Sequence, residues 1–198
     1  MPKIRTGIYG GSFNPIHNGH VAIAQKMVGM AGLDEVWLVV SPQNPLKRAD
    51  GLLADSLRLE MTRMALEPYP RLVASDFEFG MPRPSYMWNT LQALTARYPE
   101  REFTLLIGAD NWAVFDRWYH AADIIAHYPM AIYPREGYDI CAASLPATVR
   151  LVDTGLYNIS STMVRQMVRQ GDDISRLVPP QIVDMVVGLY TPNGMKEK

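Results

Sequence analysis

The sequence predicts an α/β fold in which a doubly wound, parallel sheet carries helices on both faces. Three observations point to it. Short apolar runs alternate along the chain with stretches whose apolar residues recur at helical spacing. The runs EVWLVV (35–40) and EFTLLI (102–107) are almost continuously apolar, as expected of strands buried on both faces. Regular alternation of strand and helix implies right-handed crossovers, and therefore parallel strands.

Each element follows from its period, taken in chain order. Six segments are expected to be strands because their apolar residues run together or alternate, and the third of them is the weakest: 3–9, 35–40, 72–79, 102–107, 130–133 and 149–152. Four helices are expected between the strands because apolar residues recur every three or four positions. They are a helix over about 18–30, one carrying Leu53, Leu57, Met61 and Met64, one carrying Met87, Leu91, Leu94 and Tyr98, and one ending at 124–126. Helices at 161–170 and 180–190 close the chain.

Length and composition limit the function classes. The 198 residues favour a single domain over 1–198, with residues 192–198 as a flexible tail. Nineteen basic against 20 acidic residues leave a formal charge of −1, which argues against a nucleic-acid partner. The single cysteine, Cys141, excludes an intramolecular disulfide and a cysteine-based zinc site. Neither a signal peptide nor an apolar run of the roughly 20 residues needed to span a membrane is present. We therefore expect a cytoplasmic protein with no membrane partner.

The segment after the first expected strand, GGSFNPIHNGH (10–20), has the features of a phosphate site. Adjacent glycines let backbone N–H groups approach a phosphate closely. His17 and His20 lie three residues apart at a helix start, where the helix dipole favours anions. By itself the histidine pair also fits a metal site that lacks its third ligand, or two incidental loop histidines.

Taken whole, these eleven residues resemble the G-G-[ST]-F-[DN]-P-x-H-x-G-H signature of the HxGH nucleotidyltransferase superfamily. The resemblance implies a Rossmann-like fold. It also implies that both histidines contact the phosphates of ATP and stabilise the transition state at the α-phosphorus.

A second signature, ISSTMVR, occupies residues 159–165. Ser160 is a good N-cap for the helix that follows, and a cap alone would explain it. The segment also resembles the superfamily's ISSTxxR motif, in which hydroxyls, backbone amides and the arginine hold the β- and γ-phosphates. The planar, permanently charged fork of an arginine suits that task.

Three intervening segments are similar to the bacterial nicotinate-nucleotide adenylyltransferase family. They are SPQNPLK (41–47), which ends in the family's basic residue, RPSYMWNTL (83–91), which resembles the lining of its nicotinate pocket, and IGADN (107–111) with RWY (117–119). The resemblance places Asp110 near ribose hydroxyls and Trp118 against the pyridine ring. It covers essentially the whole chain, from about residue 6 to 190.

The resemblance implies the site residues. The catalytic set is His17, His20, Lys47 and Arg165. The ATP-binding set is Gly10, Gly11, Ser12, Phe13, His17, His20, Gly108, Asp110, Ile159, Ser160, Ser161, Thr162 and Arg165. The nicotinate-nucleotide set is Ser12, Asn44, Lys47, Ser85, Tyr86, Met87, Trp118 and Tyr119. The expected reaction joins ATP and nicotinate mononucleotide to give deamido-NAD and pyrophosphate, with Mg²⁺ carried on the ATP phosphates. No protein metal ligand is expected, and self-association is left open.

Met87 departs from the family pattern, which has threonine at a position that contacts the nicotinate carboxylate. A main-chain contact would survive this change, whereas Met87 could equally serve only to pack. Two other functions remain as alternatives. Phosphopantetheine adenylyltransferases share the first signature but are shorter and lack the PSY and RWY segments. A catalytically silent nucleotide-binding regulator would keep the fold, but His17, His20 and Arg165 argue against silence.

Overall fold

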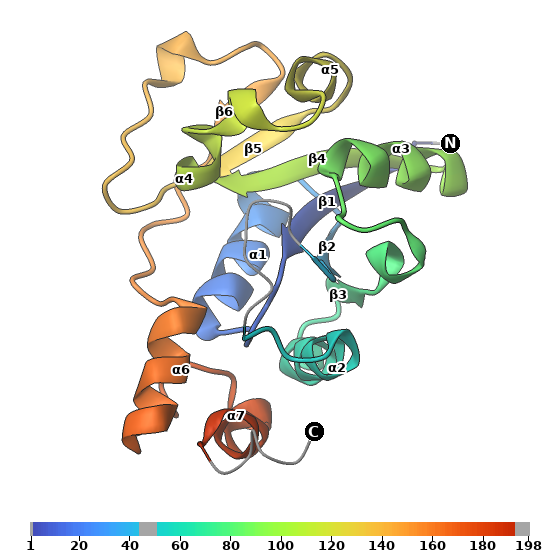
Figure 1. Cartoon of the computed structure of the whole chain (residues 1–198). Helices are drawn as coiled ribbons and strands as arrows, with labels where there is room; N and C mark the ends of the chain where they lie inside the picture. Colours follow the sequence, from blue (N-terminus) through green and yellow to red (C-terminus); the bar gives the residue numbers. More distant parts are fainter. Residues whose placement is uncertain (1, 44–50, 193–198) are drawn as a thin grey trace.

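The computed structural model describes residues 2–43 and 51–192 (Figure 1). Its centre is a six-stranded sheet in the order β3-β2-β1-β4-β5-β6, with every neighbouring pair parallel. The strands are β1 Ile4–Gly11, β2 Glu35–Val40, β3 Leu72–Ser75, β4 Arg101–Gly108, β5 Met130–Tyr133 and β6 Val149–Leu151. The predicted doubly wound, parallel α/β fold is confirmed.

Helices cover both faces of the sheet because successive strand residues point to opposite sides. The helices are α1 Asn18–Met30, α2 Asp55–Leu66, α3 Met87–Arg97, α4 Ala109–Trp112, α5 Ala121–His127, α6 Ser161–Gln170 and α7 Val183–Tyr190. One core joins β2 residues Val36, Leu38 and Val40 to α1, α2, α6 and α7. The other joins Trp37 and Val39 to α3 and α5. Within the described ranges, no helix is long and apolar enough to cross a membrane.

The structure shifts several predicted boundaries. β1 continues to Gly11, so Gly10 and Gly11 end the strand instead of opening a loop, because they align with Val39 and Val40 of β2. β3 ends at Ser75, where a short 3-10 helix, η1 Phe77–Gly80, replaces the second half of the expected strand. The tail expected at 192–198 lies outside the described residues, apart from Pro192.

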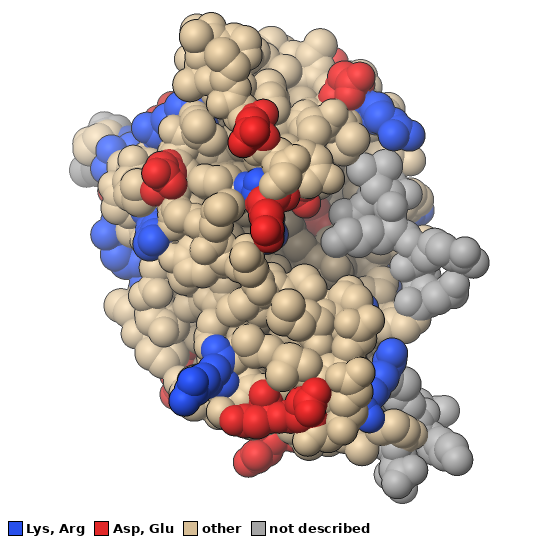
Figure 2. Space-filling view, turned by 90° about the vertical axis from the view of Figure 1, so that its left-hand side faces the viewer, with Lys and Arg blue, Asp and Glu red and all other residues tan. Residues whose placement is uncertain are grey.

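Strand order reverses between β1 and β4, since the chain builds β2 and β3 on one side of β1 and then crosses to the other. Ligands of open parallel sheets bind at the carboxyl ends of the strands beside such a reversal. Figure 2 looks onto this edge and shows a hollow near its middle, with acidic and basic side chains beside it. The carboxyl edge at β1 and β4 is therefore the place to seek a site.

Candidate active site

Two clefts open at the carboxyl edge of the sheet. The first has a volume of about 640 Å³ and is lined by segments that follow β1, β4 and β5 and by the start of α6. Its lining comprises Ser12, Asn14, His17, His20, Leu52, Asp110, Arg135, Glu136, Tyr138, residues 157–162, Met163 and Arg165. Both sequence signatures thus contribute to one cleft, although residues 17 and 165 are far apart in the chain.

The second cleft, of about 160 Å³, is more apolar and lies against the other sequence-predicted segments. Its lining comprises Tyr9, Gly10, Gly11, Ser41, Glu78, Ser85, Tyr86, Met87, residues 105–107, Asn111, Arg117, Trp118, Tyr119 and Tyr133. Gly11 and Ser12 are adjacent in the chain but line different clefts, and so do Asp110 and Asn111. The two clefts therefore adjoin at the ends of β1 and β4.

His17 and His20 form the start of α1. Their rings stack with centroids 3.6 Å apart and planes inclined by 20°. The backbone N–H of His20 donates to Nδ1 of His17 (3.4 Å), and the backbone N–H of His17 donates to Nδ1 of His20 (3.3 Å). Because both Nδ1 atoms accept, the neutral rings carry their protons on Nε2. This reciprocal cap leaves each histidine with an Nε2–H donor for a ligand.

Aromatic rings hold the histidine pair in place. The ring of Phe13 meets that of His20 edge-on at 5.0 Å, and Tyr9 meets it at 6.1 Å. His17 is 2% exposed. Burial lowers the pKa of His17 to about 3, with a further contribution from the charge of Arg135. His17 is therefore a neutral donor near pH 7 in the chain alone.

This depressed pKa predicts a pH dependence of stability. The folded value of about 3 lies below the model value of 6.5, so the unfolded chain binds the extra proton between these values. Stability is complete above pH 6.5 and falls as the pH drops toward 3. We expect the free energy of unfolding in urea to fall by roughly 1–2 kcal/mol from this residue between pH 7 and pH 5. His17→Asn, which keeps a capping side chain, should remove this part of the loss; an unchanged pH slope in that variant would contradict the assignment.

The second signature docks onto the first through backbone carbonyls. Ser161 Oγ donates to the carbonyl of Pro15 at 2.8 Å, and Arg165 Nη1 donates to the carbonyl of Asn14 at 2.7 Å. Ser160 caps α6 by accepting from the N–H of Met163 at 3.1 Å, so the cap expected from the sequence is present. Partial burial lowers the pKa of Arg165, which nevertheless stays a cation. The tertiary contacts, beyond the cap, bring the arginine to the histidine cleft.

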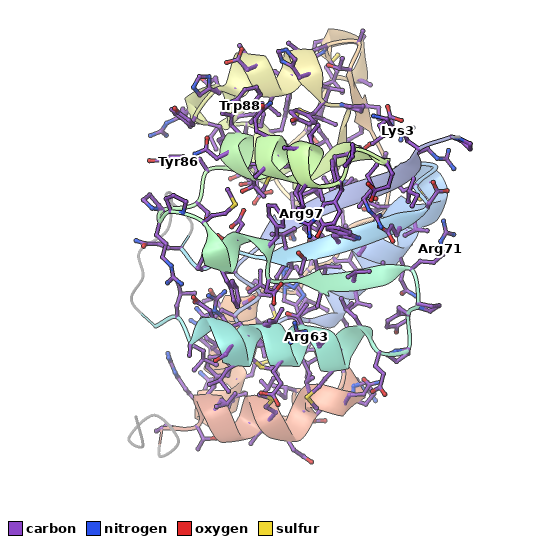
Figure 3. The ribbon with its side chains drawn as sticks, turned by 90° about the vertical axis from the view of Figure 1, so that its right-hand side faces the viewer. Lys3, Arg63, Arg71, Tyr86, Trp88 and Arg97 are labelled. Atoms are coloured by element: carbon purple, nitrogen blue, oxygen red, sulfur yellow. The ribbon has the colours of Figure 1, made fainter. Side chains whose placement is uncertain are left out.

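The second cleft is shaped by aromatic side chains and the start of α3. The rings of Tyr86 and Tyr119 lie 5.0 Å apart, and Trp118 lines the wall. In Figure 3, Tyr86 and Trp88 project from the start of α3, at the opposite end of the view from Lys3 and Arg71. No side chain among the described residues caps α3, whose first residue is Met87. Its first N–H groups are therefore available to an anion, as at other helix N-termini.

Met87 both packs and lines the second cleft. A Cβ on Gly10 would lie 2.8 Å from the Met87 terminal methyl, so the methionine fills the space that this glycine leaves. Gly108 has a similar role in the first cleft, since a Cβ there would lie 2.3 Å from Asp110 Oδ1. These two glycines allow close approach of side chains at the ends of β1 and β4.

Buried polar atoms without a partner in the chain concentrate in the clefts. In the described part of the chain, six buried side-chain nitrogen or oxygen atoms lack a hydrogen-bond partner. Five belong to cleft residues: Asp110 Oδ1 and Arg135 Nε in the first cleft, and Glu78 Oε2, Ser85 Oγ and Trp118 Nε1 in the second. Buried polar groups normally have partners, so this concentration points to ligands that supply them.

The structure brings together most of the sequence-predicted residues, with some reassignment. Of the expected ATP residues, nine line the first cleft: Ser12, His17, His20, Asp110, Ile159, Ser160, Ser161, Thr162 and Arg165. Gly10 and Gly11 line the second cleft instead, Phe13 is a buried support of His20, and Gly108 ends β4 beneath Asp110. The second cleft contains Ser85, Tyr86, Met87, Trp118 and Tyr119. Asn44 and Lys47 lie outside the described residues.

The sequence analysis missed three side chains that the structure adds. Arg135 follows β5, stands over the ring of Tyr133 at 5.2 Å, and has its Nε 3.7 Å from Asp110 Oδ1. Glu78 is 2% exposed and accepts from Thr90 Oγ1 at 2.8 Å; burial raises the pKa of its carboxyl group, partly offset by facing hydroxyls. Asn14 Oδ1 accepts from the Tyr190 hydroxyl at 2.6 Å. Only the position of Asn14, inside the first signature, could have drawn attention to it.

A doubly wound sheet with two adjoining polar clefts at its switch point, one of them lined by a histidine pair at a helix start, defines a nucleotide-binding protein of the nucleotidyltransferase class. The family model described as cytidylyltransferase-like matches residues 8–167. A probable nicotinate-nucleotide adenylyltransferase of Bacteroides fragilis is 46% identical over 187 residues, which cover 94% of this chain and 93% of that protein. One of Bacteroides thetaiotaomicron is 48% identical over 184 residues, covering 93% and 91%. The chain belongs to the nicotinate-nucleotide adenylyltransferase family.

A solved structure has the same fold. It is the Plasmodium falciparum nicotinic acid mononucleotide adenylyltransferase complexed with NaAD, with a TM-score of 0.79 at 20% identity over 94% of this chain and 97% of that one. At this identity the likeness concerns the fold.

Proposed function

We propose that this protein transfers the adenylyl group of ATP to nicotinate mononucleotide, giving deamido-NAD and pyrophosphate. One observation carries the proposal: two clefts, each matching one predicted substrate site, adjoin at Gly11–Ser12 and Asp110–Asn111 beside the histidine pair. The phosphate of the acceptor nucleotide attacks the α-phosphorus of ATP in line, and pyrophosphate leaves. Such a reaction requires positioning and charge neutralisation more than covalent chemistry by the protein.

ATP occupies the first cleft in this proposal. The Nε2–H groups of His17 and His20 face the α-phosphate, while Arg165 and the start of α6 hold the β- and γ-phosphates. Asp110 takes the ribose hydroxyls, which would give its unpartnered oxygen a donor. Arg135 adds a cation to the same cleft. Lys47, for which the resemblance implies a basic role at both nucleotides, remains part of the proposal.

The residues of the first cleft fit a Mg²⁺ ion held by substrate. Asp110 and Glu136 are the carboxylates in its lining, and the described residues contain no group of three or more His, Cys, Asp or Glu side chains able to hold a metal ion. Mg²⁺ commonly keeps several waters and binds through substrate phosphates with one or two carboxylates. When bound, it would neutralise charge on the phosphates of ATP.

The second cleft takes the nicotinate group. Backbone N–H groups donate only, so they favour a carboxylate, whose two oxygens both accept. The open start of α3 at Met87 supplies such groups, and Trp118 stacks on the ring. An amide in the same place would turn an NH₂ donor toward other donors, at a cost of about 1–3 kcal/mol.

Acceptor selectivity tests this proposal. We expect kcat/KM, measured by pyrophosphate release, to be about 5- to 150-fold higher with nicotinate mononucleotide than with the nicotinamide nucleotide. Met87→Thr should change this ratio only mildly because the main chain selects, whereas Trp118→Ala should weaken both acceptors. Trp112→Ala is the matched control, since Trp112 packs on Phe115 and lines neither cleft.

Two outcomes would contradict the proposal in different ways. Equal use of the two pyridine nucleotides would leave a general pyridine-nucleotide adenylyltransferase. Pyrophosphate release with phosphopantetheine and with neither pyridine nucleotide would place the protein elsewhere in the superfamily, and release with no acceptor at all would favour a silent regulator.

A further inference from the structure

Arg58 of α2 is a charged side chain with no exposure to solvent. Its guanidinium donates four hydrogen bonds: Nε to the carbonyl of Leu53 (3.0 Å), Nη1 to the carbonyls of Ser12 (2.6 Å) and Ser41 (2.8 Å), and Nη2 to Asp55 Oδ1 (2.6 Å). A buried charge is costly unless it is paired and hydrogen-bonded, and here it is both. Neither sequence signature includes this residue.

The two carbonyls on Nη1 belong to different clefts. Ser12 follows the last residue of β1 and lines the first cleft, while Ser41 follows the last residue of β2 and lines the second. A single nitrogen atom therefore joins the backbone of the proposed ATP site to that of the proposed acceptor site. Their common attachment limits how far one can move relative to the other.

Asp55 extends this connection to the acceptor segment. Its Oδ1 accepts from Arg58, and its Oδ2 accepts from Arg83 Nη2 at 2.7 Å. Arg83 lies two residues before Ser85, and residues 85–87 line the second cleft. The chain Arg58–Asp55–Arg83 thus runs from the end of β1 to the start of α3.

Arginine is the side chain that this arrangement requires. Its planar fork reaches acceptors in three directions at once, whereas a lysine offers all its donors from one atom. An apolar side chain of similar size would avoid the desolvation cost but would leave the carbonyls of Ser12 and Ser41 without this link.

We infer that Arg58 is a positioning residue that sets the distance between the two bound substrates. The inference rests on the proposed function, because only a reaction between two bound nucleotides makes their separation matter. In-line attack is sensitive to small displacements, and about 1 Å can cost a factor near 100 in rate. Loss of Arg58 should therefore lower kcat much more than it raises either KM.

The test compares Arg58→Lys and Arg58→Met with Arg63→Met. Arg63 lies on the same helix (Figure 3), but its side chain is 59% exposed and pairs only with Asp76 at 3.3 Å. Pyrophosphate release is measured with ATP and nicotinate mononucleotide varied in turn, well below the thermal midpoint of each variant. We expect kcat to fall by about 10- to 100-fold in both Arg58 variants with little change in either KM, and no change in Arg63→Met.

A folded Arg58→Lys with wild-type kcat would overturn the inference and leave Arg58 a purely structural residue. So would a rise in one KM at constant kcat, since that would tie Arg58 to a single substrate. If neither Arg58 variant folds, Arg83→Met decides, because its side chain is half exposed and its removal frees the acceptor arm alone. That variant should lower kcat/KM for the acceptor and leave KM for ATP unchanged; unaltered acceptor kinetics would also overturn the inference. Wild-type protein that releases no pyrophosphate would instead refute the proposed function.

Discussion

Replacing His20 by alanine should lower kcat by about 10²-fold or more while KM for ATP changes little. The cap geometry directs the Nε2–H of His20 away from the helix, where it can donate to phosphate oxygens whose charge grows as the acceptor attacks. An interaction that strengthens only in the transition state appears in kcat and not in KM. Steady-state kinetics of pyrophosphate release, with both substrates varied, gives the two constants separately.

Two variants separate this role from helix capping and from general effects of losing a histidine. His17→Asn keeps an N-cap side chain but has no Nε2–H, so it should fold normally and still lose kcat. His127→Ala, on the exposed side of α5 and outside both clefts, should behave as wild type. If His20→Ala instead retains kcat and shows a large rise in KM for ATP, the histidine serves binding alone.

Arg165→Ala should reduce kcat/KM for ATP by roughly 10²- to 10³-fold, the scale of losing one charge-stabilising donor. Arg165 already donates to the carbonyl of Asn14 and to Thr162 Oγ1 at 3.2 Å, which fixes the plane of the guanidinium at the cleft. Its remaining donors are then oriented toward the polyphosphate of ATP before the nucleotide arrives. Such preorganisation is what the tertiary contact adds to the charge.

Arg165→Lys tests the geometric part of this prediction. Lysine keeps the charge but cannot hold two protein acceptors and the phosphates with one planar fork, so its activity should lie between alanine and wild type. Arg169→Ala, one turn later on the exposed face of α6, is the matched control and should bind ATP normally. Full activity of the lysine variant would reduce the role of Arg165 to its charge, and full activity of the alanine variant would remove the role.

The sequence by itself determined the fold class and the composition of the candidate site. Apolar period and strand–helix alternation are local signals, and they predicted α1 at 18–30 and α6 at 161–170 with the bounds that the structure shows. The two signatures also contain their own local geometry: His17 and Ser160 are N-caps, as their residue types and positions suggested. Such features depend on neighbours within one helical turn, so the sequence carries them directly.

Only the tertiary structure decided how these parts meet. Gly10 and Gly11 became the end of β1 because β2 pairs with them, and Met87 fills the space beside Gly10 across 77 positions of the chain. Arg58, Arg135 and Glu78 gave no sequence signal, since a lone arginine or glutamate at helical spacing or after a strand looks like an exposed residue. Their roles depend on burial and on acceptors such as the carbonyls of Ser12 and Ser41, which come from other strands. Burial and long-range hydrogen bonds are properties of the packed chain, and they set the relation between the two clefts on which the proposed reaction depends.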